Sequence, residues 1–210
     1  MEHKNLPHPA EVAAFIVGKE YGKETIQIYT DGSRNEQGVG TGVMMFSGNE
    51  LVKTLNYRLD SRCSNNQAEQ QAIAKSLEAL EKTDIEENSP PTAAIITDSK
   101  ISLDSIKNMN NHSYLIEENR ERLSKLERSN WTVTFVWVKA HAGILGNELA
   151  DQMCKTTARD EDMTSFSRIH FSTLFRELEE ESKLKWQQNW EESPKAAQTK
   201  QFHPNITDTL

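Results

Sequence analysis

The stretch Ile26-Gln-Ile-Tyr-Thr-Asp-Gly-Ser33 decides the fold of this chain. Its first five residues alternate between apolar and polar, which predicts a half-buried strand, and its Asp-Gly-Ser end predicts a turn. Two more β-prone runs follow, from Val39 to Phe46 and from Leu51 to Tyr57, separated by hairpin-turn residues at 47–50. Three strands joined in this way predict an antiparallel meander.

The spacing of apolar residues becomes helical after the meander. Residues 65–82 carry one apolar face, and residues 93–98 form a short apolar run typical of a buried strand. Further helices are expected at about 101–109, 113–128 and 147–159, with a β-prone run at 131–138 between the last two. Either Ser99 or Asp98 can cap the first of these helices. The order predicts an α/β fold whose five-stranded mixed sheet combines the meander with two strands parallel to the first.

The chain divides into three parts by composition. Residues 1–23 are polar and mixed, which indicates a leader or linker, and residues 24–160 contain the predicted sheet and helices. Residues 161–210 are expected to form an amphipathic helical extension, helical from about Thr164 to Trp190, followed by a polar tail. Its apolar stripe has two interpretations, a helix packed on the core or a docking surface for another domain or partner.

Composition limits the setting in which the protein works. The two cysteines, Cys63 and Cys154, are too few for a disulfide framework or a four-cysteine zinc site, which indicates a reducing compartment. No stretch approaches the ~20 apolar residues of a membrane span, and no signal peptide is recognisable. We therefore expect an intracellular protein, nuclear or cytoplasmic, with no membrane contact.

The charge balance bears on nucleic-acid binding. A formal net charge of −8 argues against a uniformly basic surface of the kind that phosphate contacts favour. Much of the acidity, however, gathers in three segments that are typical of solvated loops or faces, at 84–88, 160–162 and 177–181. A local basic strip can coexist with that charge.

Four acidic residues carry the predicted chemistry: Asp31, Glu69, Asp98 and Asp151. Each lies at the start or end of an expected strand or helix, and two of them end β-branched runs, where carboxylates gain nothing from burial. Ligands of such sheets bind at the carboxyl ends of the parallel strands, so we expect the acids to converge there. Converging carboxylates repel one another unless a divalent cation neutralises them, which predicts an Mg²⁺-dependent nuclease.

Four segments, in their order along the chain, resemble the catalytic segments of the RNase H family. The resemblance spans about residues 25–159 and implies an RNase H-like fold and an endoribonuclease that hydrolyses the RNA strand of RNA–DNA hybrids. It further implies 5′-phosphate and 3′-hydroxyl products. The segments are Thr30-Asp-Gly-Ser33, Ser64-Asn-Asn-Gln-Ala-Glu69, Thr97-Asp-Ser99 and His141-Ala-Gly-Ile-Leu-Gly-Asn-Glu-Leu-Ala-Asp151.

The resemblance also implies a role for each acid in holding two Mg²⁺ ions, for which Mn²⁺ is an expected substitute. Asp31 would bridge both ions, Asp98 would bind the ion on the nucleophile side, and Asp151 the ion on the leaving-group side. Glu69 would bind metal and contact a 2′-hydroxyl of the RNA strand. His141 would assist proton transfer or product release. The alternative for His141 is an ordinary surface-loop histidine.

Several polar residues are implied to contact the substrate. Arg62, Ser64 and Asn147 would grip a phosphate of the DNA strand, although Arg62 could also be a solvated loop charge. Asn65 and Asn66 would reach base edges or sugars in the minor groove, or else cap the helix that begins there. The predicted substrate-binding set is Ser33, Arg62, Ser64, Asn65, Asn66 and Asn147.

The sequence of one segment resembles a particular subgroup of this family. The run from Lys139 to Asp151 is similar to the RNase H domain of non-LTR, LINE-like retrotransposons, in which the domain lies downstream of a reverse transcriptase. We therefore expect a piece of such a polyprotein, with that reverse transcriptase domain as a partner. The sequence does not determine the oligomeric state. Residues 110–113 lead directly into a helix of mixed charge, so the basic substrate-gripping helix found in some members is absent.

Two other functions remain open from sequence. One is a catalytically weak hybrid-binding or structural module with the same fold. The other is a DNA-directed nuclease that shares the fold and the metals. Four intact carboxylates disfavour the first, and Glu69 with the two asparagines favours RNA recognition over the second.

Overall fold

The computed structural model describes residues 14–17, 25–83, 90–159, 164–194, 197–202 and 204–205. The chain divides into two compact units, Met1–Arg168 and Ile169–Leu210, which are described separately. The first unit extends past residue 160, where the sequence placed the end of the domain. Most of the expected leader, residues 1–13 and 18–23, lies outside the described part of the chain.

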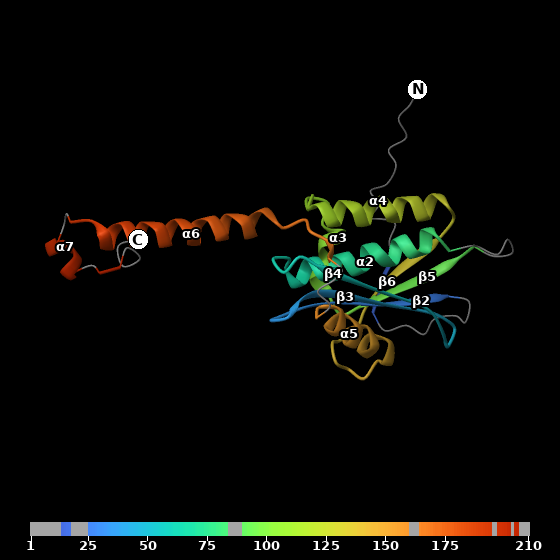
Figure 1. The fold of residues 1–210 in the computed structure, drawn as a ribbon. Helices are drawn as coiled ribbons and strands as arrows, with labels where there is room; N and C mark the ends of the chain where they lie inside the picture. The colour runs from blue at the N-terminus through green and yellow to red at the C-terminus, as the bar shows by residue number, and fades with distance from the viewer. Residues whose placement is uncertain are drawn as a thin grey trace, which may run out of the picture. The chain divides into compact units, whose positions relative to one another are not determined.

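The first unit is built on a mixed sheet with the strand order β1-β6-β5-β2-β3-β4-β7. Figure 1 labels the central strands, β2 to β6. Its five central strands are the predicted ones, with β2, β3 and β4 antiparallel and with β5 and β6 parallel to β2. The short strands β1 and β7 add to the two edges. The strands are β1 (Ala14–Val17), β2 (Ile26–Asn35), β3 (Gly38–Ser47), β4 (Glu50–Leu59), β5 (Thr92–Thr97), β6 (Thr132–Trp137) and β7 (Thr164–Phe166).

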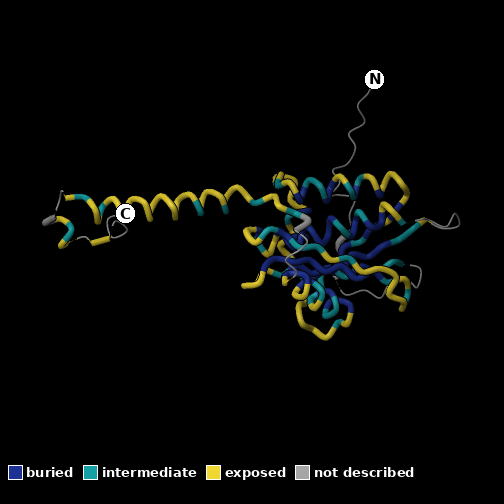
Figure 2. Tube along the Cα trace, in the orientation of Figure 1, coloured by how far each residue is buried: buried dark blue, intermediate teal, exposed yellow. Residues whose placement is uncertain are grey.

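Helices cover both faces of this sheet. In Figure 1, α2, α3 and α4 lie on one side of the strands and α5 lies on the other. The buried residues concentrate in the central strands and on the helix faces that meet them, as Figure 2 shows. The helices are α2 (Asn65–Glu81), α3 (Lys100–Lys107), α4 (Tyr114–Arg128) and α5 (Leu145–Thr157).

Strand β2 is longer than predicted, and this difference sets the position of the first carboxylate. The predicted turn at Asp31 is wrong, because β2 continues to Asn35 in antiparallel pairing with β3. Parallel pairing of β2 with β5 stops at the pair Thr30–Thr97. The next residues along the two strands are Asp31 and Asp98, so both carboxylates lie at the carboxyl end of the parallel pair.

Helix capping and strand pairing decide three further local predictions. Ser99, not Asp98, caps α3, because its side chain accepts a hydrogen bond from the Ser102 amide. The predicted helix from Thr164 is wrong at its start, since residues 164–166 form β7. Segment 1–23, expected to be a leader or linker, contributes β1 to the sheet.

The second unit contains α6 (Phe171–Glu192) and α7 (Ala197–Phe202). The extension is helical, as expected. No described residue of α6 is buried, and most of its apolar residues are exposed. No helix among the described residues has the length and apolar character needed to cross a membrane.

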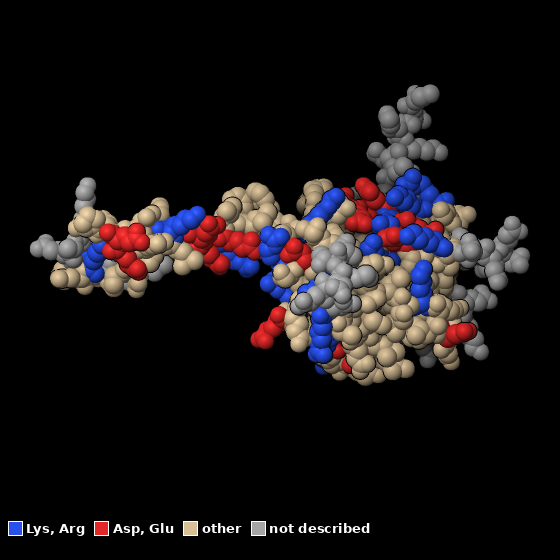
Figure 3. Space-filling view, viewed as in Figure 1, with Lys and Arg blue, Asp and Glu red and all other residues tan. Residues whose placement is uncertain are grey.

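Surface charge on the first unit is mixed. Figure 3 shows acidic and basic side chains interspersed over the face that carries α2 and α4. Arg122 of α4, for example, forms ion pairs with Glu78 and Glu81 of α2 and with Glu118 of its own helix. This face offers no continuous basic surface to a nucleic acid.

Candidate active site

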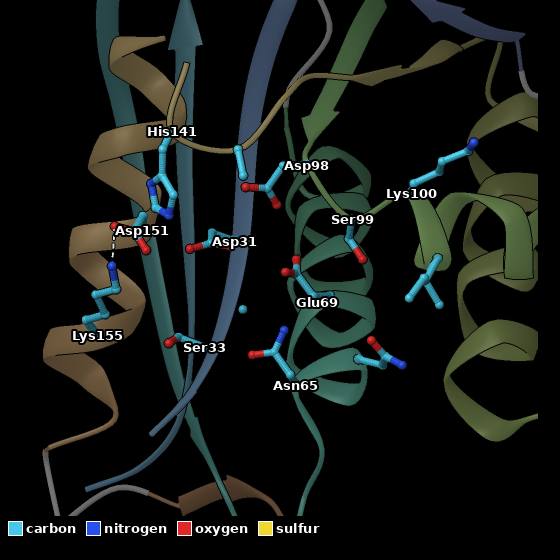
Figure 4. A pocket seen from close by; sticks show the side chains of 14 residues that line it. Asp31, Ser33, Asn65, Glu69, Asp98, Ser99, Lys100, His141, Asp151 and Lys155 are labelled. Atoms are coloured by element: carbon cyan, nitrogen blue, oxygen red, sulfur yellow. Dashed lines mark hydrogen bonds and ion pairs between the residues drawn. The ribbon is translucent and has the colours of Figure 1, made fainter. Parts of the chain in front are cut away.

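The four predicted carboxylates converge on one cleft of about 520 Å³. Asp31 comes from β2, Asp98 follows β5, Glu69 lies in α2 and Asp151 lies in α5. Figure 4 shows their side chains turned toward a common space at the end of the parallel strands.

A close contact between β2 and α2 brings Glu69 beside Asp31. A Cβ atom on Gly32 would lie 2.3 Å from the Glu69 amide nitrogen and 2.5 Å from the Ala68 carbonyl carbon. No side chain larger than hydrogen fits there without a shift of the backbone. Glycine at position 32 therefore allows the helix backbone to rest on the strand one residue after the central carboxylate.

Glycines of β3 place Asp151 in a similar way. A Cβ atom on Gly42 would lie 2.3 Å from the Ala150 carbonyl oxygen, and one on Gly40 would lie 2.4 Å from that of Cys154. Helix α5 therefore packs directly against the β3 backbone. The pair Asp31–Gly42 is in register across β2 and β3, so this contact holds Asp151 beside Asp31.

Burial and mutual repulsion raise the pKa of two of the carboxyls. The pKa of Asp31 rises from 3.8 to about 6, mainly because burial removes water and also because Asp98 and Asp151 are close. The pKa of Glu69 is raised well above its ordinary value by burial and by the charges of Asp31 and Asp98. An unneutralised cluster therefore opposes its own full ionisation.

The arrangement fits a divalent cation. Oxygen atoms of Asp31, Glu69 and Asp98 all lie within 4.8 Å of one another. Glu69 is 5% exposed, and its Oε2 atom has no hydrogen-bond partner among the described residues. Buried polar atoms are rarely left unpaired, so this oxygen is suited to a ligand that the cleft receives. A set made of carboxylate oxygens suits Mg²⁺ or Mn²⁺ better than a soft metal.

His141 lies at the rim of the cleft, on the loop before α5. Its backbone has φ of 52°, in the left-handed region that residues other than glycine seldom adopt. Its Nδ1 atom lies 3.9 Å from Glu148 Oε2, and the side chain is largely exposed. His141, Glu148 and Asp151 offer a second group of potential ligands within 4.8 Å.

The predicted substrate residues fall into two groups. Ser33, Asn65 and Asn66 line the cleft with the carboxylates. The Asn65 side-chain oxygen accepts a hydrogen bond from the Arg34 backbone at 3.0 Å. Ser64 is the residue that caps α2, so the capping alternative for the two asparagines is wrong.

Three further predicted residues, Arg62, Ser64 and Asn147, are not among the residues that line this cleft. Arg62 bonds to both carboxylate oxygens of Asp60, each at 3.1 Å, in the turn before α2. Asn147 is buried, and its Nδ2 atom donates to Asp98 Oδ2 at 3.2 Å. Asn147 therefore orients a carboxylate in this structure, whereas its predicted role was to bind phosphate.

Sequence reasoning missed two neighbours of the carboxylates on α5. The Cys154 thiol donates to Asp31 Oδ2 at 3.1 Å, a contact that lowers the pKa of Asp31 against the effect of burial. Lys155 forms an ion pair of 2.6 Å with Asp151 and lines the cleft. Helical spacing offered the signal, because residues three and four positions after Asp151 lie on its face of the helix.

A mixed sheet with acidic side chains at the carboxyl end of its parallel strands, flanked by helices, is an arrangement that suits a nuclease. A model of the RNase H family matches residues 23–159. A ribonuclease H of Ruthia magnifica subsp. Calyptogena magnifica is 32% identical over 142 residues, 61% of this chain and 91% of that protein. A ribonuclease H of Maricaulis maris (strain MCS10) is 31% identical over 145 residues, with shares of 62% and 91%.

The chain belongs to the RNase H family. The matched range contains all four carboxylates and every strand from β2 to β6. The expected enzyme class, a ribonuclease H, is confirmed by this membership.

Proposed function

We propose that this protein is an endonuclease that hydrolyses the RNA strand of RNA–DNA hybrids and leaves 5′-phosphate and 3′-hydroxyl ends. Membership of the RNase H family supports this substrate. The observation that carries the chemistry is the cluster of Asp31, Glu69 and Asp98, in which Asp31 and Glu69 are buried and Glu69 keeps an unpaired oxygen.

In this proposal the four carboxylates hold two Mg²⁺ ions, with Mn²⁺ as a substitute. Asp31 belongs to two groups of potential ligands, one with Glu69 and Asp98 and one with Asp151, so it would contribute to holding both ions. Asp98 would hold the ion on the nucleophile side and Asp151 the ion on the leaving-group side. When bound, such a pair activates a water molecule and neutralises the charge that develops on the phosphate. Asn147 and Cys154 keep Asp98 and Asp31 oriented through the hydrogen bonds that they donate.

Other residues of the cleft act on the substrate. Asn65 and Asn66 lie at the start of α2 beside Glu69, where their amides can bond to sugars and base edges of a minor groove. Glu69 would also accept a hydrogen bond from a 2′-hydroxyl. His141 is exposed at the rim, where it can exchange protons with solvent and assist departure of the product.

The test is cleavage of end-labelled duplexes by the full chain in Mg²⁺, in Mn²⁺ and in EDTA. RNA–DNA, RNA–RNA and DNA–DNA duplexes are compared, and Asp31→Asn and Asp98→Asn serve as inactive variants. Metal-dependent cuts confined to the RNA strand of the hybrid support the proposal. Cleavage of DNA duplexes would instead assign a DNA-directed nuclease.

Binding without cleavage would assign the alternative function, a hybrid-binding or structural module. Fluorescence anisotropy with a labelled hybrid distinguishes this result from a failure to bind. Retained cleavage in Asp31→Asn would overturn the metal assignment, because Asp31 is the residue that the other carboxylates surround.

We further propose that the protein acts within a non-LTR retrotransposon polyprotein and removes template RNA during reverse transcription, in the nucleus or the cytoplasm. The similarity of residues 139–151 to that group supports this role. Its partner would be the reverse transcriptase domain of the same polyprotein. Stimulation of hybrid cleavage by that domain, supplied separately or fused, is the expected result, and an unchanged rate would contradict it.

A further inference from the structure

The first unit continues past the range that the family model matches. Residues 164–168, called here the β7 segment, follow the matched range 23–159 and belong to the same compact unit. Strand β7 pairs in parallel with the end of β4, and the Asp60 amide donates to the Phe166 carbonyl oxygen at 2.8 Å. The β7 segment therefore adjoins the turn that leads into α2.

One side-chain amide joins the β7 segment to the first turn of α2. Gln67 Nε2 donates to the Arg168 carbonyl oxygen at 2.9 Å, while Gln67 Oε1 accepts from the Ser64 amide at 3.0 Å. The Ser64 hydroxyl in turn accepts from the Gln67 amide, which completes the capping box. The same residue thus caps the helix and binds the β7 segment.

Apolar and cationic contacts hold the β7 segment in place. Phe166 packs against a small buried cluster that underlies the helix start. The Arg168 guanidinium lies 3.8 Å from the centre of the Tyr114 ring at the start of α4. The members of the buried cluster are Val39, Leu59, Cys63 and Ala68.

The element fixed by these contacts carries residues of the cleft. Asn65 and Asn66 belong to the first turn of α2, and Glu69 follows one turn later. On the other side, Arg34 bonds to Asn65 through its backbone and to the Cys63 carbonyl oxygen through Nη1 at 3.2 Å. The start of α2 is therefore held from β2 on one side and from the β7 segment on the other.

We propose that the β7 segment is a positioning element for substrate binding, which sets the start of α2 so that Asn65 and Asn66 face the hybrid. This inference rests on the proposed function. A helix start that samples other positions is competent to bind for less of the time, which weakens apparent affinity by that fraction. Glu69 lies deeper in α2 and packs on Gly32, so the chemical step should be affected less.

The test uses the full chain with two matched substitutions. Phe166→Ala removes the apolar contact of the β7 segment, and Phe171→Ala removes an aromatic ring that is 67% exposed in α6. Gln67→Glu is a third variant, which keeps an acceptor for the Ser64 amide but loses the donor to Arg168. We expect Phe166→Ala and Gln67→Glu to raise KM for the hybrid about five- to tenfold with kcat within about twofold, and Phe171→Ala to change neither.

Hydrogen exchange supplies a measurement that needs no substrate. Amides of residues 63–68 should exchange faster in Phe166→Ala than in the parent chain, and at the parent rate in Phe171→Ala. Unchanged exchange, or faster exchange with an unchanged KM, would overturn the proposal, as would a fall confined to kcat. If the parent cuts no hybrid, the proposed function fails, and Kd for the hybrid replaces KM in the same comparison.

Discussion

Replacing Asp31 by asparagine should abolish cleavage and stabilise the protein in the absence of metal. In the unfolded chain this carboxyl ionises near 3.8, whereas in the folded protein its pKa is about 6. Between these values the folded protein retains a proton that the unfolded chain has released. The stability contributed by the protonated carboxyl is therefore present below pH 3.8 and is lost as the pH rises through 6.

The expected size of the effect follows from that rise in pKa. At pH 7.5 the ionised carboxylate costs the folded state about 3 kcal/mol, and at pH 4.5 it costs about 1 kcal/mol. Asp31 is 6% exposed, so solvent screens little of this cost. Asp31→Asn removes the charge but keeps an oxygen that can accept from Cys154. We expect a gain of about 3 kcal/mol at pH 7.5, or about 6–12 °C in Tm, and about 1 kcal/mol at pH 4.5.

The assay is urea denaturation in EDTA at both pH values, followed by tryptophan fluorescence. Asp60→Asn is the control with the opposite sign, because hydrogen bonds from Arg62 lower the pKa of Asp60. That variant should gain no stability at pH 7.5. Equal stabilisation of Asp31→Asn at both pH values, or a loss of stability at pH 7.5, would refute the reasoning that burial and repulsion raise the pKa of Asp31.

Three further predictions concern the same cluster. Adding Mg²⁺ at pH 7.5 should raise the Tm of the parent chain and raise that of Asp31→Asn much less; equal shifts in a thermal scan would contradict the ligand assignment. Gly32→Ala should cost about 1–3 kcal/mol in urea denaturation and slow cleavage at least about tenfold, because its Cβ would lie 2.3 Å from the Glu69 amide. Cys154→Ala removes a hydrogen bond that lowers the pKa of Asp31, so the acid limb of the cleavage profile should move to higher pH. A limb that stays in place would show that the thiol contact is unimportant.

The central sheet could be predicted because its signals are local. Alternation in β2 and the apolar run of β5 identify strands without knowledge of their partners. The end of β2 could not be predicted in this way, since Asp-Gly-Ser is typical of turns. It is pairing with β3 that keeps residues 31–35 extended. Strands β1 and β7, of four and three residues, depend on the edges that they join.

The four carboxylates of the candidate site could be predicted from the sequence, whereas the residues that contact them could be predicted less well. Four carboxylates at the ends of elements indicate convergence, because the topology places those ends together. The contact of Asn147 with Asp98 joins residues that lie 49 positions apart, and that of Cys154 with Asp31 spans 123 positions. Helical spacing places Cys154 on the Asp151 face of α5, but it does not identify Asp31 as its partner. Both contacts depend on how closely α5 rests on the sheet.

The two faces of the sheet pack against their helices in different ways, and the glycines of β3 account for the difference. On the face toward α2 and α4, the main core cluster is made of interlocking side chains such as Ile28, Val43 and Phe135. On the face toward α5, contact runs through backbone atoms at Gly40 and Gly42. Substitutions in the core cluster can therefore alter how tightly the domain holds together while Asp151 keeps its place. The stability of the domain and the placement of Asp151 therefore depend on opposite faces of the sheet.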